Sequence, residues 1–179
     1  QLREVAVISA NPAAPTFDNT IIALEKSGQL LQRTSTVFFS LSGVENNDAL
    51  KALQAEYAPK LSAHRDAITL DPVLFARIQK LYDTRESLGL DAQGVRLIER
   101  YHTDFVRAGA RLSDADKAHL KQINGELAKL GTRFTQNVLA EVNDSALVVD
   151  SRAELAGLTD AQIDAAAAAA KAKGLDGKY

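Results

Sequence analysis

The sequence of 179 residues contains no methionine, no cysteine and no tryptophan. Because translation starts at methionine and this chain starts at Gln1, we expect it to be a piece of a longer protein. Residues 175–179 read as the opening of a further element, in keeping with that expectation. The absence of cysteine excludes disulfides and thiolate metal sites within the chain.

The sequence also lacks an excess of basic charge and a long apolar run. There are 21 basic and 23 acidic residues, so we expect no nucleic-acid partner. The longest uncharged apolar run is 165–170, far shorter than the ~20 residues that span a bilayer, and we expect no membrane segment. No stretch resembles a secretion signal, which favours a cytoplasmic protein and leaves a periplasmic one open.

What the sequence does contain is apolar residues at helical spacing. Pro12 and Pro15 predict that residues 1–15 are extended. Thr16 is a candidate N-cap for a first helix, whose apolar face is interrupted by Gly28. This glycine indicates either a helix that tolerates it at a cost of ~1 kcal/mol or close packing by another helix.

Three further helices have their own start signals. Asn46-Asn47-Asp48 precedes a second helix, which Pro59 should bend. Asp71-Pro72 starts a third, with aspartate as the cap and proline as the first helical residue. Asp91 starts a fourth helix, which runs toward Gly109.

The fifth helix is the longest, and it begins with the capping box Ser113-x-x-Asp116. Its apolar residues alternate by three and four, as in the seam of a coiled coil. We expect this seam to be buried and central to the fold. The seam residues are Leu120, Ile123, Leu127, Leu130, Phe134 and Val138.

These patterns predict an all-α protein. We expect an array of about six to seven helices, mostly antiparallel, with at most one short strand, for which 145–150 is the candidate. Capping boxes at Ser151 and Thr159 predict two small helices near the end of the chain. Residues 1–179 are interpreted as one helical domain; the resemblance described below implies that it is the N-terminal one.

Few residues suggest chemistry. The three histidines are His64, His102 and His119, and none lies in an HExxH motif. Glu99-x-x-His102 could hold iron in a four-helix bundle, but such a site needs a second pair, which is absent. We read His64 as a partly buried residue of a helix face and His119 as a surface residue. We therefore predict no catalytic, cofactor-binding or metal-binding residue in this chain.

Six blocks of residues carry a resemblance that covers nearly the whole chain. They are 10–12 with 17–28, 58–61 with 64–68, 74–78 with 81–82, 101–110, 124–128, and 134–139. As an ordered set they resemble the N-terminal helical region of bacterial peptidyl-dipeptidases. These are zinc metallopeptidases of the thimet oligopeptidase and neurolysin group.

The resemblance implies a larger peptidase with two mostly helical halves around a channel. The intact protein would bind one zinc and hydrolyse short peptides, removing dipeptides from their C-termini. The family's HExxH motif lies far toward the C-terminus and is absent here, so no catalytic residue is carried over. This piece would form part of the channel wall, with the C-terminal catalytic half and short peptides as its partners. The alternative is an autonomous helical interaction module without enzymatic activity, which would pair through the seam of the longest helix.

Overall fold

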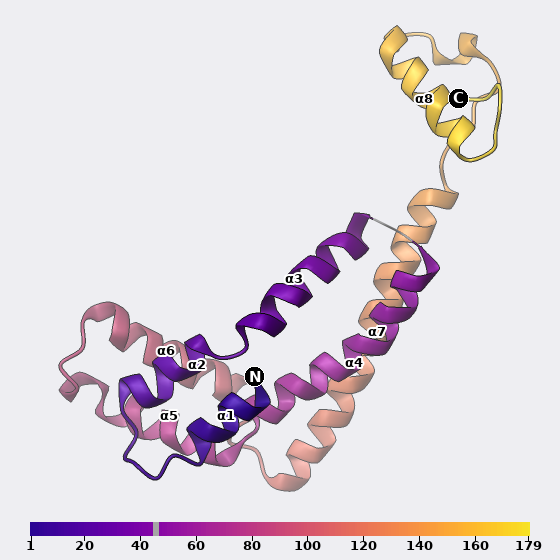
Figure 1. Cartoon of the computed structure of the whole chain (residues 1–179). Coiled ribbons are helices and arrows are strands. Elements are labelled where there is room, and N and C mark those ends of the chain that lie inside the picture. The colour runs from indigo at the N-terminus through magenta and orange to yellow at the C-terminus, as the bar shows by residue number, and fades with distance from the viewer. Residues whose placement is uncertain (45–46) are drawn as a thin grey trace. The chain divides into compact units, whose positions relative to one another are not determined.

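The computed structural model describes residues 1–44 and 47–179, apart from the side chains of residues 43–44 and 142–144. The chain divides into two compact units, Gln1–Phe134 and Thr135–Tyr179, called here the first and second units. Asn46, which the sequence placed before the second helix, lies outside the described residues. The two units are described separately below (Figure 1).

The first unit is helical throughout. The prediction of an all-α protein is confirmed, because the described residues form seven α-helices of eight residues or more and no strand. One four-residue helix, two 3₁₀ turns and a π-helical turn complete the set. The elements of the first unit are α1 (Leu2–Ser9), η1 (Phe17–Ile22), α2 (Ala23–Lys26), α3 (Gln29–Val44), α4 (Asp48–Thr69), α5 (Pro72–Thr84), η2 (Arg85–Ser87), α6 (Ala92–Arg107) and α7 (Asp114–Asp144), the last of which continues into the second unit.

The hydrophobic core of the first unit lies among α1, η1, α2, α5 and α6. Ile21, Leu74, Ile78 and Ile98 are completely buried there. Phe105 of α6 and Val5 and Ile8 of α1 close the same cluster. Burial of such side chains contributes roughly 1.5–3 kcal/mol each, so this cluster holds the unit together.

Helix starts agree with the sequence signals. The Thr16 hydroxyl accepts from the Asn19 amide, and the Asp71 carboxylate accepts from the first-turn amides of α5. Asp91 and Ser113 cap α6 and α7 in the same way. Each cap satisfies amides that a helix terminus leaves without partners.

Two expectations for the N-terminal region are corrected. Residues 2–9 form α1 rather than an extended segment, because Pro12 acts on itself and on the residue before it, and therefore leaves Leu2–Ser9 unrestricted. The first predicted helix breaks at Gly28, which has a φ of 72°. Its amide donates to the Glu4 carboxylate at 2.9 Å, and a Cβ there would meet the Gln1 side chain, so α1 packs closely at this break.

The second unit contains η3 (Arg152–Leu155) and α8 (Asp160–Ala172). Both predicted capping boxes are present, at Ser151 and Thr159. The candidate strand at 145–150 is not assigned as one; Val149 instead exchanges two backbone hydrogen bonds with Tyr179, each of 3.0 Å. Val149, Ile163 and Ala170 are buried in this small unit.

No helix in the described part of the chain is both long enough and apolar enough to cross a membrane.

Candidate functional site

The histidines singled out in the sequence occupy three separate environments. His64 of α4 is partly buried, and its Nε2 lies 2.8 Å from Gln1 Oε1. Burial, and then the N-terminal amine, lower the pKa of His64. His119 is exposed on α7. Among the side chains that the structure describes, no group of three or more His, Asp or Glu residues could hold a metal ion.

His102 is a buried, stacked residue of α6. Its ring lies 3.8 Å from the Tyr82 ring, centroid to centroid, and 5.8 Å from that of Phe75. Its Nε2 is 3.0 Å from Gln79 Oε1, and Arg111 donates to the same oxygen. Burial, and then the Arg111 charge, lower the pKa of His102, so the neutral imidazole is favoured.

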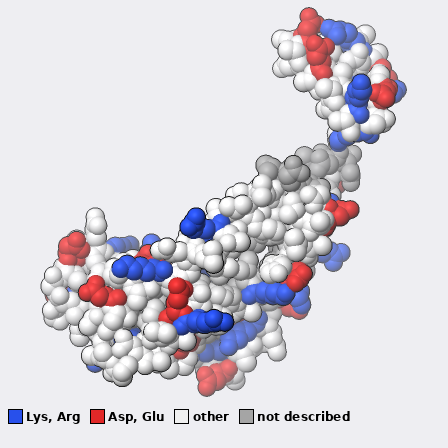
Figure 2. All heavy atoms as spheres, in the orientation of Figure 1, with Lys and Arg blue, Asp and Glu red and all other residues white. Residues whose placement is uncertain are grey.

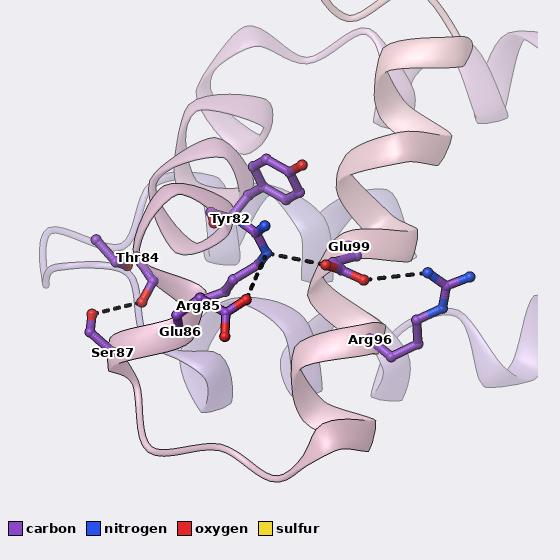
Figure 3. Close-up of polar contacts among 7 residues, drawn as sticks. All are labelled: Tyr82, Thr84, Arg85, Glu86, Ser87, Arg96 and Glu99. Atoms are coloured by element: carbon purple, nitrogen blue, oxygen red, sulfur yellow. Dashed lines mark hydrogen bonds and ion pairs between the residues drawn. The ribbon is translucent and has the colours of Figure 1, made fainter.

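Glu99 does not join His102 in a metal site. Its carboxylate accepts from Arg85 Nε at 3.2 Å and from Arg96 Nη1 at 3.3 Å (Figure 3). Arg85 also donates to the Tyr82 carbonyl and lies over the Tyr82 ring, 4.2 Å from its centroid. Arg96 pairs with Glu99 within α6, and the ion pair with Arg85 holds the end of α5 against α6.

Arg77 is a buried residue whose role was not predicted. Its guanidinium donates to the carbonyls of Asn11 and Ala13, at 2.9 and 3.1 Å, and to Asn19 Oδ1 at 2.9 Å. Within the described part of the chain, its Nε is the one buried side-chain polar atom without a partner. The sequence held a signal, since Arg77 lies between Leu74 and Ile78 on the inward face of α5. A charged residue on an inward helix face is expected to be buried and hydrogen-bonded to polar partners. Here the partners of Arg77 are carbonyls of the loop before η1.

An open pocket of about 500 Å³, with both polar and apolar lining, lies where α4 and the end of α6 approach α7. Arg65 and Arg107 line it, together with the buried Asp66, which accepts from Asn124 of α7 at 2.8 Å. This hydrogen bond links α4 to the part of α7 that belongs to the first unit. At this point side chains do not fill the space between the two long helices α4 and α7.

The seam predicted on α7 is not buried within the described chain. Leu127 is 60% exposed and Phe134 is 69% exposed, while Ile123 and Leu130 are also exposed. The expectation of a central, buried seam is wrong for this chain, because α1, α5 and α6 fill the core among themselves. The apolar stripe exists, but its covering surface is absent from the described residues.

A second uncovered apolar region lies on α3 and α4. The two helices enclose a groove of about 390 Å³, lined mainly by Leu31, Phe38, Phe39, Leu53, Tyr57 and Leu61. Three aromatic residues, Phe38, Phe39 and Tyr57, therefore line a surface groove, and Phe39 is exposed. The exposed apolar side chains of the α7 seam and of the α3–α4 groove suit packing and binding.

Comparison with known proteins identifies the class to which such a helical array belongs. No protein-family model matches the chain. Over 162 residues, 90% of the chain, it is 26% identical to oligopeptidase A of Haemophilus influenzae and covers 24% of that protein. The chain belongs to the peptidase family that contains oligopeptidase A and the dipeptidyl carboxypeptidases.

Within this family the chain matches the N-terminal quarter of dipeptidyl carboxypeptidase. It is 46% identical to the Escherichia coli protein of that name and 42% identical to that of Salmonella typhimurium, over 176 residues in both cases. Each match covers 98% of the chain and 26% of the relative. The chain thus spans about a quarter of the length of these curated relatives, and the resemblance seen in the sequence is confirmed.

Proposed function

We propose that this chain is the non-catalytic N-terminal helical domain of a zinc-dependent dipeptidyl carboxypeptidase that acts on short peptides. The observation that carries the proposal is the 46% identity over 98% of the chain, confined to 26% of the relative. The described residues offer no metal site, so we assign zinc and the reaction itself to the remainder of the protein. On this proposal, none of the residues of this chain is catalytic.

The domain would form part of the wall of the substrate channel. Its apolar stripe on α7 and its groove between α3 and α4 support a packing role against the C-terminal catalytic half. The cytoplasmic compartment expected from the sequence stays a prediction.

The test is reconstitution from two separately produced pieces, the 179-residue chain and the remaining C-terminal part of the peptidase. Cleavage of a short peptide should require both pieces, while the chain alone should neither cleave it nor bind zinc tightly in a calorimetric titration. Full activity of the C-terminal part alone, or stoichiometric tight zinc binding by the chain, would refute the proposal.

An autonomous interaction module remains the second candidate, and the exposed seam on α7 is the observation that favours it. It predicts self-association through that seam. Light scattering over a concentration series separates the two candidates, since the peptidase domain should have no dedicated dimer of its own.

A further inference from the structure

The helix α3 carries almost no charge, yet several of its large apolar side chains are exposed. Arg33 is its single charged residue among sixteen. A helix with so little charge is ordinarily covered on most sides, because apolar surface left in water is unfavourable. In Figure 2 the surface over α3 is correspondingly almost free of charged side chains.

The side chains of α3 divide into two faces. Leu31 and Phe38 point to the groove shared with α4. Leu30, Val37 and Leu41 follow at spacings of seven and four, which places them within about 40° of one another around the helix. These three residues are defined here as the outer face of α3. They are 78%, 60% and 50% exposed, so nothing in the described chain covers them.

We infer that the outer face of α3 is the docking site for an apolar segment from the remaining three quarters of the same peptidase. This inference rests on the proposed function. The chain covers 26% of its dipeptidyl carboxypeptidase relatives, so most of such a protein lies outside it and is available as the occupant. The three side chains of the outer face are apolar and select an apolar partner, since an acidic or basic one would lose its hydration without compensation there. Arg33 lies at the edge of the face, three residues after Leu30 and four before Val37.

The size of the face favours a covalently linked segment over a second copy of the chain. An aliphatic side chain whose burial is worth up to ~3 kcal/mol at ~25 cal/mol per Å² offers about 120 Å², so the uncovered area of Leu30, Val37 and Leu41 is about 200 Å². A stable complex between separate proteins needs about 800 Å² per partner. A segment of the same chain binds at an effective concentration of the order of millimolar, so a smaller face is sufficient.

The test compares Val37→Asp with Thr36→Asp, in the 179-residue chain and in the intact peptidase that contains it. The two positions are adjacent and exposed, and both variants add one negative charge to the middle of α3. Val37 lies on the outer face, whereas Thr36 is about 100° away around the helix. In the free chain, both variants should leave the thermal midpoint within about 2 °C of the parent.

In the intact peptidase, Val37→Asp should lower the midpoint by more than about 5 °C, because it places a charge in an apolar contact, while Thr36→Asp should not. Amides of α3 should also exchange more slowly in the intact protein than in the free chain. Equal midpoints for the two intact variants, together with unprotected α3 amides, would overturn the inference.

That negative result would leave the proposed function standing, provided that reconstituted activity still requires both pieces. Two other outcomes also overturn the inference. One is a dimer of the free chain that Val37→Asp abolishes, seen by sedimentation. The other is a shift of α3 signals on addition of a short apolar peptide to the intact protein, which would assign the face to substrate.

Discussion

The location of the core can be tested by replacing two leucines that differ only in burial. Leu74 of α5 is fully buried, with 0% of its surface exposed, whereas Leu127 of α7 is 60% exposed. Leu74→Ala removes a packed side chain and leaves a cavity, for which about 3 kcal/mol of unfolding free energy is expected, within the usual 2–5 kcal/mol. Leu127→Ala removes only the ~40% of a leucine surface that is withdrawn from water. At ~25 cal/mol per Å² this is about 0.7 kcal/mol, partly offset by the better helix propensity of alanine.

The measurement is urea denaturation of the 179-residue chain, followed by helical circular dichroism and by tyrosine fluorescence. Tyr82 and Tyr101 pack against the core of the first unit, whereas Tyr179 belongs to the second. On a Tyr179→Phe background, tyrosine fluorescence therefore reports on the first unit when the second unfolds separately. Leu74→Ala should lower the stability of the first unit by at least ~2 kcal/mol more than Leu127→Ala does. Equal losses at every protein concentration would show that α7 is buried in the free chain and that the assignment of the core is wrong.

Three further predictions concern single residues. Arg77→Met should cost about 2–3 kcal/mol by leaving the acceptors of the N-terminal loop unpaired, measured as a loss of thermal stability that Arg77→Lys partly restores. Gly28→Ala should destabilise by more than about 1 kcal/mol because its φ is 72°, whereas Gly125→Ala, in open space within a helix, should stabilise by up to ~1 kcal/mol in the same denaturation assay. Because burial and Arg111 hold the pKa of His102 below 6.5, the unfolded chain binds the proton more readily, and stability should fall as pH drops below about 6.5. His102→Gln should reduce the change in urea midpoint between pH 7.5 and 5, and the remaining change should come in part from His64, whose pKa is lowered as well.

The helix starts could be predicted because their signals are local. Thr16, Asp71, Asp91 and Ser113 each bond to an amide two or three residues away, so a short stretch of sequence contains the whole interaction. For Gly28 the sequence left two alternatives open, a helix that tolerates the glycine or close packing by another helix. The outcome depended on Glu4, 24 residues earlier, whose carboxylate accepts from the freed amide.

The features that were missed depend on contacts distant in sequence. The helix α1 forms because Val5 and Ile8 bury one face in a core supplied by α5 and α6. Arg77 reaches Asn11, 66 residues away, and no local pattern identifies the partner of a buried guanidinium. Tertiary packing overrides weak local preferences in both places.

The wrong assignment of the seam on α7 has a different cause. A repeat of apolar residues at spacings of three and four shows that a helix face will be covered, but it does not show by what. For α5 the cover lies within the chain, and Leu74 and Ile78 are fully buried. For α7 the same pattern includes the exposed Leu127 and Phe134, and α3 presents Leu30 and Val37 uncovered in the same way. Two helices that independently present uncovered apolar faces are therefore better explained by one large structural partner than by two local defects, and this is the partner that the proposed peptidase supplies.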